Sequence, residues 1–427
     1  MRYFCISLLI FTFACFEPAR ANAAPLPADR SSRAITLAEA RTKALQANPG
    51  LQALGAEVQA LEGNLLQTKA FPNPEIEIAR EDFGGGGVLE ARAPQDTLAL
   101  SQLFETGGKR SARSEAAAQE KEAANQNLLA GRLDLTAEVD RRFVTLLGAQ
   151  IRLRITAESK TTAEKTTAAV AALVQAGEVA PIEELRARSE EALAQVDFEA
   201  AQRELFITRR ALSQLWGLEE PDFDSAAGAL AEEVPIPEEE TALARLAALP
   251  DLARRRAQTQ RLVAQDQLAQ RLNWPDLTLS VGQRRYTETG ELAYLAALTM
   301  PLPLFNRNRG AILEAASRLQ QGRLEGRAEE MHLQAALHSA HETLSGSANE
   351  VRILHEDVLP KAAQVYDAVQ EGYRRGKYGL LDLLQAQRNL SEANLRHLDA
   401  LIRLNLAKAD LERLLGAPIE SIEGDRQ

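Results

Sequence analysis

An internal duplication is the feature that most constrains how this 427-residue chain folds. Residues 242–286 repeat the pattern of residues 44–82, and matched residues in this part are 201 positions apart. Farther along, the matched residues keep an offset of 199. The matched pairs are Pro49/Pro250, Pro74/Pro275, Phe104/Phe305, Gly177/Gly376, Leu185/Leu384 and Gly217/Gly416. Self-similarity that keeps its order along the chain predicts two copies of one structural unit.

Each copy has the pattern of a helix, two strands, a very long helix, a tight turn and a further helix. In the first copy, residues 109–175 contain no proline and are rich in Ala, Glu, Gln and Leu. A helix of this span would be roughly 100 Å long, which predicts a coiled-coil-like assembly. In the second copy Pro360 interrupts the corresponding stretch, so we expect the long helix to bend or break there.

Four short segments alternate apolar and polar residues, as strands with one apolar face do. In residues 276–281, for example, Leu277, Leu279 and Val281 alternate with polar residues. The predicted strands span about 75–82, 96–104, 276–286 and 291–300. Aromatic residues lie near their ends, where an aromatic girdle would lie: Phe71, Trp274, Tyr286 and Phe305.

Four strands cannot close a barrel, and an open edge cannot exist in lipid because its backbone groups would lack hydrogen-bond partners. If the strands enter a membrane, other copies of the chain must supply the missing partners. A dimer would provide eight strands, and a trimer would provide twelve strands around a lumen. Short alternating runs also occur in small soluble sheets packed on helices, so the strand pattern leaves both architectures open.

The first residues have the features of a cleaved secretory signal. Arg2 precedes an apolar run too short to span a bilayer, and small residues at 21–23 end it, so we expect residues 1–23 to be removed after Ala23. Lipid attachment at Cys15 is the alternative. Cys5 and Cys15 are the only cysteines, so the mature chain would contain no disulfide, thiolate metal ligand or cysteine nucleophile.

Composition excludes several classes of function. The formal net charge of −11 argues against nucleic acid, whose binding needs a basic face. The glycines at 84–87 are not followed by the lysine and hydroxyl residue of a phosphate-binding loop, and no nucleophile elbow is present. We therefore expect neither an enzyme nor a cofactor.

Several segments resemble the TolC-like outer-membrane efflux proteins. Residues 35–53, ITLAEARTKALQANPGLQA, are similar to the opening of that family, and residues 373–390, YRRGKYGLLDLLQAQRNL, resemble its periplasmic helix-turn-helix. Residues 71–85 and 101–113 look most like the CzcC-type branch, which serves heavy-metal efflux pumps. The resemblance extends over essentially the whole mature chain.

This resemblance implies a mainly α fold with a small β part. A homotrimer would form a twelve-stranded outer-membrane β-barrel, in contact with outer-membrane lipid, continued by a coiled-coil α-helical tunnel through the periplasm. It would dock on a periplasmic adaptor (membrane fusion protein) joined to an RND-type inner-membrane pump, and would passively conduct divalent heavy-metal cations. Alternatives are a duct for drugs or secreted protein, and a periplasmic coiled-coil scaffold.

The domain organisation follows from these patterns. We expect a first repeat at 24–218 and a second at 242–427, which together form one barrel-plus-tunnel domain. Residues 219–241 between them are acidic and contain prolines, which is typical of an exposed linker.

Two predicted helix-to-helix turns are the best functional candidates. Glycine permits a reversal between antiparallel helices, and exposed residues at the turn could contact helical tips of an adaptor. The candidates are Gly177, Glu178, Val179, Ala180 and Pro181 in the first copy, and Gly376, Lys377, Tyr378, Gly379 and Leu380 in the second. Plain turn chemistry without a partner is the alternative.

Charged residues next to these turns are gate candidates. In a trimer each carboxylate would form a ring of three that favours cations, and nearby arginines could pair with the carboxylates in a closed state. The carboxylates are Glu183, Glu184 and Asp382, and the arginines are Arg186, Arg374 and Arg375. A solvated helix face is the alternative.

Two histidines offer a weak metal-site pattern. His338 and His341 are three residues apart on a predicted helix, with Glu342 beside them. No third ligand is clearly placed, and a tight site would hinder release from a conduit. Polar surface histidines are the favoured interpretation, so we assign no metal site.

Overall fold

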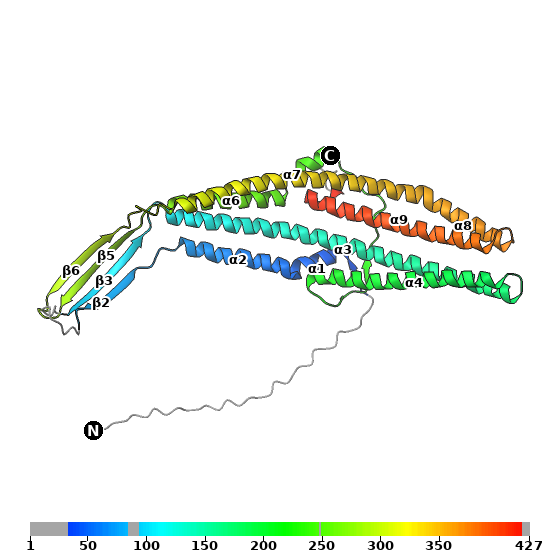
Figure 1. Cartoon of the computed structure of the whole chain (residues 1–427), viewed down its shortest axis with the longest axis horizontal. Helices are drawn as coiled ribbons and strands as arrows, with labels where there is room; N and C mark the ends of the chain where they lie inside the picture. The colour runs from blue at the N-terminus through cyan, green and yellow to red at the C-terminus, as the bar shows by residue number, and fades with distance from the viewer. Residues whose placement is uncertain (1–32, 84–93, 247–248, 421–427) are drawn as a thin grey trace, which may run out of the picture.

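The computed structural model describes residues 33–83, 94–246 and 249–420. The expected signal segment 1–23 with Cys15, and the glycines at 84–87, lie outside these residues. The molecule is long and mainly helical, with a four-stranded sheet at one end and two helix-to-helix turns at the other (Figure 1). The prediction of a mainly α fold with a small β part is confirmed.

The two halves of the chain contain similar series of elements. The first half contains β1 (Ala34–Thr36), α1 (Leu37–Ala47), α2 (Pro49–Lys69), β2 (Glu75–Glu81), β3 (Gln95–Phe104), α3 (Lys109–Gln175) and α4 (Pro181–Ser213). A 3₁₀ turn at Gln214–Trp216 and β4 (Ser225–Ala227) follow. The second half contains α5 (Glu239–Leu246), α6 (Pro250–Arg271), β5 (Leu277–Tyr286), β6 (Leu292–Thr299), α7 (Arg309–Ile353), α8 (Leu359–Arg374) and α9 (Leu380–Leu415).

The long helices begin and end where proline and glycine dictate. α3 runs for 67 residues, matching the predicted range 109–175, and ends before Gly177, whose φ of 75° stops the helix. In the second half, α7 passes into one π-helical turn at Leu354–Val358, and α8 then begins with Pro360 in its first turn. Proline cannot donate the helical hydrogen bond, so the regular spacing breaks there, as predicted.

The four predicted strands form one antiparallel sheet in the order β2-β3-β5-β6. Residues that face each other across the strands form apolar and polar rows alternately. One apolar row is Ile76, Leu100, Val281 and Ala296, and the next row is Glu75, Ser101, Ser280 and Ala297. Within the described part of the chain, the outer edges of β2 and β6 pair with no other strand.

The main hydrophobic core lies in the middle of the molecule. It gathers fully buried side chains from α3, α4, α7 and α9, including Leu146, Leu212, Leu344 and Leu404. Among the helices that the structure describes, none is long and apolar enough to cross a membrane.

The connecting segment is not an exposed linker, and that expectation is wrong. Phe223, only 3% exposed, Leu230 and Val234 are buried in the main core. β4 pairs in parallel with β1. Two side-chain amides also form hydrogen bonds with backbone N–H and C=O groups of the segment, as a neighbouring strand would. Gln150 on α3 bonds to both backbone groups of Ala226, and Asn405 on α9 does the same with Ala231. Residues 219–241, which we call the strap, therefore cross the helices as a packed segment.

Replacing a buried apolar residue of this strap tests its role. We expect Phe223→Ala to lower the free energy of unfolding by about 3–5 kcal/mol, because the side chain packs against Trp216 with ring centroids 6.0 Å apart. Ile236→Ala, in the same segment but 39% exposed, is the matched control and should lower it by less than about 1 kcal/mol. Urea unfolding of the purified protein measures both changes, and equal small effects would contradict a packed strap.

Candidate functional site

The two predicted turns lie together at the end of the molecule away from the sheet (Figure 1). They have the same backbone geometry. In the first, Gly177 has φ 75° and the N–H of Glu178 donates to the carbonyl of Leu173 at 2.9 Å. In the second, Gly376 has φ 69° and the N–H of Lys377 donates to the carbonyl of Gly372 at 2.8 Å. Both glycines are in the left-handed conformation that ends a helix and reverses the chain.

The start of the following helix is fixed differently in the two turns. Pro181 is in the first turn of α4, with Ala180 as its cap. At α9, the carboxylate of Asp382 accepts a hydrogen bond from the backbone N–H of Gly379 at 3.0 Å. Asp382, a gate candidate, is therefore a helix-capping residue in this conformation.

The second turn carries an aromatic side chain that the first one lacks. The ring of Tyr378 lies directly on Gly372, so a Cβ added there would come within 2.2 Å of it. Gly372 is buried beneath the ring, while Tyr378 is about half exposed. The glycine thus provides the space that holds Tyr378 against the helix pair.

A small hydrophobic cluster joins the two turns. Its buried members are Val170, Ala187, Leu380, Leu383 and Leu384, contributed by α3, α4 and α9. Leu380, predicted as a contact residue, is only 6% exposed and supports the cluster from inside. Val179 is half-buried, and the remaining turn residues from Gly177 to Ala180 and from Gly376 to Gly379 are exposed.

The gate candidates pair mostly along their own helices. Glu183 pairs with Arg186 at 2.9 Å and Glu184 pairs with Arg188 at 2.6 Å. Arg375 pairs with Glu371 at 2.7 Å. Within the described part of the chain, Arg374 forms no ion pair with Glu183, Glu184 or Asp382. Exposed pairs at this spacing contribute little to stability.

One gate carboxylate also connects the two turns electrostatically. Burial raises the pKa of Tyr373 on α8, and the negative charge of Glu183 on α4 raises it further. The two turns are therefore close enough for a charge on one to act on the other.

The two candidate metal-binding histidines bond to the strap instead. The ring of His338 lies 2.7 Å from a carboxylate oxygen of Glu239, and Nε2 of His341 lies 2.9 Å from the carbonyl of Pro237. The described residues contain no group of three or more His, Cys, Asp or Glu side chains arranged to hold a metal ion.

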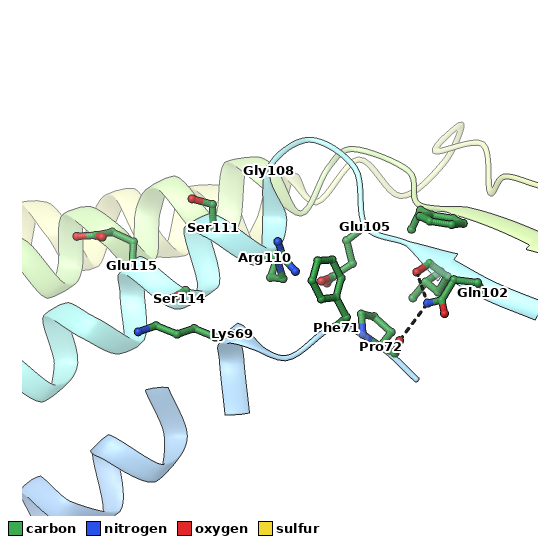
Figure 2. Close-up of a pocket in the computed structure, with 12 residues that line it drawn as sticks. Lys69, Phe71, Pro72, Gln102, Glu105, Gly108, Arg110, Ser111, Ser114 and Glu115 are labelled. Atoms are coloured by element: carbon green, nitrogen blue, oxygen red, sulfur yellow. Dashed lines mark hydrogen bonds between the residues drawn. The ribbon is translucent and has the colours of Figure 1, made fainter. Parts of the chain in front are cut away.

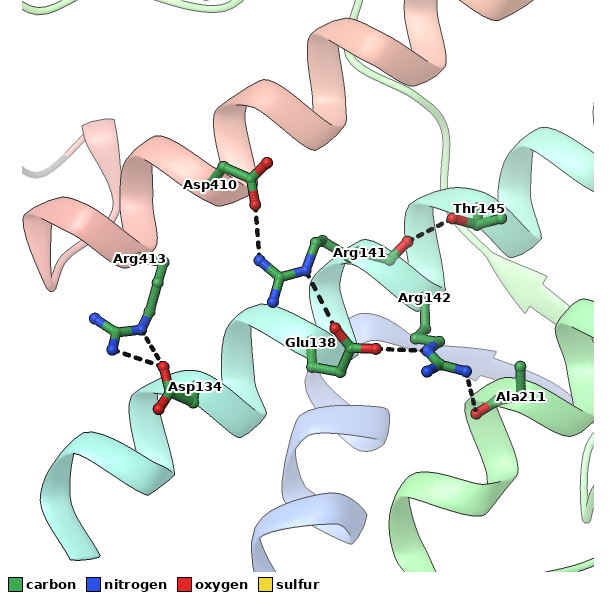
Figure 3. Close-up of polar contacts among 8 residues, drawn as sticks. All are labelled: Asp134, Glu138, Arg141, Arg142, Thr145, Ala211, Asp410 and Arg413. Carbon is green, nitrogen blue, oxygen red and sulfur yellow. Dashed lines mark hydrogen bonds and ion pairs between the residues drawn. The ribbon is translucent and has the colours of Figure 1, made fainter. Parts of the chain in front are cut away.

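Two groups of ion pairs join α3 to neighbouring helices in the middle of the molecule, and sequence patterns did not reveal them (Figure 3). Arg413 on α9 bridges Asp134 at 2.6 Å and Asp251 at 2.8 Å, and it is mostly buried. Arg141 pairs with Asp410 at 2.7 Å and with Glu138. These contacts tie α3 to α9 and α6.

Glu138 illustrates how these arginines act on their partners. Burial alone would raise its pKa, but hydrogen bonds from Arg142 and Arg141 outweigh that effect and hold the pKa below its ordinary value (Figure 3). Its carboxylate therefore stays ionised. Because the partners lie up to 279 positions apart in the sequence, their spacing gives no signal.

A second feature that sequence patterns did not reveal is a hollow where the sheet meets the helices (Figure 2). Its volume is about 900 Å³, and it lies between the start of β2 and the start of α3. The guanidinium of Arg110 is 3.5 Å from the ring centroid of Phe71, a cation–π contact. Phe71 and Phe104 are exposed there although both are aromatic.

Comparison with known proteins identifies the family. A model described as "Outer membrane efflux protein" matches residues 40–218 and 244–417. The chain belongs to the outer membrane efflux protein family. The resemblance to TolC-like proteins, including the CzcC-type branch, is confirmed.

Curated members of this family include metal-resistance proteins. The chain is 33% identical, over 90% of both chains, to the cobalt-zinc-cadmium resistance protein CzcC of Cupriavidus metallidurans. It is 28% identical to the nickel and cobalt resistance protein CnrC of the same organism, over 65% of this chain and 66% of that one.

Solved structures of outer-membrane channels have the same fold. The MtrE channel of Neisseria gonorrhoeae matches with a TM-score of 0.74 at 22% identity, over 89% of each chain. The CmeC channel of Campylobacter jejuni matches with a TM-score of 0.77 at 14% identity, over 91% of this chain and 88% of that one. The homologues are channel proteins of the efflux family.

The contact between Gly372 and Tyr378 predicts that the effect of one substitution on the free energy of unfolding changes sign when the ring is removed. In the wild-type background, Gly372→Ala should lower the free energy of unfolding by about 1 kcal/mol, because the new methyl displaces the ring. In a Tyr378→Ala background the same change should raise it by roughly 0.5–1 kcal/mol, since alanine favours a helix over glycine. Thermal unfolding of the four proteins measures this. The same sign in both backgrounds would contradict the contact.

The pairing of His338 with Glu239 predicts a pH-dependent contact. The hydrogen bond with Glu239, and then its charge, raises the pKa of His338. The stabilisation from this charged pair is therefore fully present below the ordinary histidine pKa and is lost as pH rises through the raised value. We expect Glu239→Gln to lower the pKa of His338 in an NMR titration. Glu342→Gln, which removes a weaker influence, should lower it less; equal shifts would contradict this pairing.

Proposed function

We propose that this protein is the outer-membrane channel of a tripartite efflux system and provides a passive exit for divalent heavy-metal cations. The observation that carries the proposal is the 33% identity with CzcC over 90% of both chains. A channel fold and three metal-resistance relatives support it. The protein needs no chemistry of its own, because an inner-membrane pump would supply the energy and most of the selectivity.

The proposed working form is a homotrimer with a twelve-stranded barrel. The open edges of β2 and β6 support this, because unpaired backbone groups cannot remain in lipid. A stripe of exposed apolar side chains along α4 also calls for a covering partner. It consists of Ile182, Leu185, Leu193, Val196, Phe206 and Ile207.

The proposed location follows from the two ends of the molecule. The apolar rows of the sheet are exposed and would face outer-membrane lipid, while the helices would lie in the periplasm. Export would use the signal segment, cleaved near Ala23. The two repeats, 24–218 and 242–427, would together form one barrel-plus-tunnel domain.

The exposed turn residues are the proposed docking points for a periplasmic adaptor, which would connect the channel to an RND-type pump. Gly177 to Pro181 and Gly376 to Gly379 would make the contacts, and Leu380 would position them from below. The paired positive-φ glycines and the shared hydrophobic cluster support this role, because they present both turns as one rigid surface.

Glu183 and Glu184 are the proposed cation-favouring ring at the end of the tunnel, with Asp382 close to its helix cap. In a trimer each would occur three times around one axis. They pair with Arg186 and Arg188 one turn along the same helix, and both arginines are exposed while the two carboxylates are half-buried.

Growth of a deletion strain tests the cargo. We expect the strain to lose tolerance to one or a few of Zn²⁺, Co²⁺, Cd²⁺, Ni²⁺ and Cu²⁺, and a plasmid-borne copy of the gene to restore it. Detergents and dyes in parallel cultures serve as the control. Unchanged metal tolerance with new sensitivity to organic compounds would instead favour a drug duct.

Extraction behaviour separates a channel from a periplasmic scaffold. A channel should remain with the outer membrane and need detergent, whereas a scaffold should be released by osmotic shock as a soluble rod. Release without detergent would overturn the proposed location.

A further inference from the structure

The two open edges of the sheet end at the same level of the molecule. β2 runs away from the helices, and β6 returns toward them, because neighbouring strands are antiparallel. The residues just before β2 and just after β6 therefore both lie where the sheet meets the helices (Figure 1). If β6 pairs with β2 of a second copy, residues 300–309 of one chain meet residues 71–76 of the other.

The chain already contains one junction of this kind, between its own two halves. The end of β3 meets the start of β5, where Phe104 is the cross-strand partner of Leu277. Just beyond, the N–H of Thr106 donates to Asp276 at 3.1 Å, and Nζ of Lys109 lies 2.9 Å from the same carboxylate. This junction is a template for the one between copies.

The strand register transfers the template to the open edges. Leu98 pairs with Ile78, and Leu298 pairs with Leu279, so β6 follows β3 at an offset of 200. The helix caps agree, because Gly108 before α3 has φ 73° and Asn308 before α7 has φ 55°, a conformation that a non-glycine residue rarely adopts. The corresponding pairs are Phe104 with Leu304, Lys109 with Arg309 and, at the offset of 201, Asp276 with Glu75.

The segment after β6 is held in one shape although it contacts little within its own chain. Pro301 and Pro303 restrict its backbone, and the N–H of Leu304 donates to the carbonyl of Leu302 at 2.8 Å, a γ-turn. The side-chain amide of Asn308 donates to the carbonyl of Ala269 at 2.8 Å and anchors the end. Such a segment loses little conformational entropy on binding.

The segment after β6 has exposed apolar side chains. Phe305 is 100% exposed, and Leu302 and Leu304 are also exposed. The opposite edge presents the matching surface, with Ile76 at 70% exposure beside Phe71 and the hollow at the start of α3 (Figure 2). The charges are complementary as well, because Arg309 follows one segment and Glu75 lies at the other.

We propose that residues 301–309 of one protomer dock on residues 71–76 of the next, with Leu304 and Phe305 against Ile76 and Phe71, and Arg309 paired with Glu75. This docking rests on the proposed trimer and specifies how its barrel is fixed to its helices between protomers. The ion pair of the template, Lys109 with Asp276, is kept between chains as Arg309 with Glu75. Each of the three interfaces would contain one such junction.

Photo-crosslinking tests the placement of Phe305. The full chain carries p-benzoylphenylalanine at position 305, and cells are irradiated with the protein in its membrane. We expect a crosslinked dimer whose tryptic adduct falls on residues 70–80 of another chain. The same probe at Tyr294, an aromatic residue of β6 that is 85% exposed, is the control and should give no adduct on 70–80. Adducts of position 305 with lipid alone would overturn the proposal.

Charge reversal tests the ion pair. Arg309→Glu and Glu75→Arg should each remove most of the crosslinked dimer formed from position 305. The two changes combined should restore most of it, because opposite charges again face each other. If the combined variant behaves like either single variant, Arg309 and Glu75 do not pair.

Light scattering of the wild-type protein in detergent separates this proposal from the trimer itself. A trimeric mass without the 70–80 adduct overturns the junction and leaves the proposed channel in place. A monomeric mass overturns both.

Discussion

The pairing left open at the two edges of the sheet governs the rest of the molecule. Each strand interior to the sheet satisfies its backbone groups within the chain, but β2 and β6 each leave one side unmatched. In lipid that deficit can be met only by another strand, so the chain is complete only as part of a ring. The helices are affected as well, because α2 precedes β2 and α7 follows β6 in the chain. Pairing of these two edges between copies therefore also sets the spacing of the attached helices.

The elements that sequence patterns predicted are those specified by local chemistry. Glycine marks both ends of α3 and the turns at Gly177 and Gly376, and alternation marks the strands. The bend near Pro360 follows from the missing N–H of one residue. Such signals act over a few positions, so they can be read without knowing what the chain packs against.

The features that sequence patterns missed depend on distant partners. The strap looks like a linker because acidic residues and prolines surround its few apolar residues. Its burial depends on Gln150 and Asn405, whose amides lie on helices 76 and 174 positions away. Leu380 belongs to an exposed turn by position, yet its side chain enters the cluster between the two hairpins. Arg413 and its carboxylates likewise meet only after the long helices align.

The duplicated halves have diverged in one mechanical respect. The first hairpin rises on an unbroken 67-residue helix, whereas the second contains a π-helical turn between α7 and α8. An unbroken helix resists bending along its whole length, but a π-helical turn concentrates bending at one point. In a ring of three such chains, bending would therefore occur mainly at the three π-helical turns, while the three unbroken helices keep their shape.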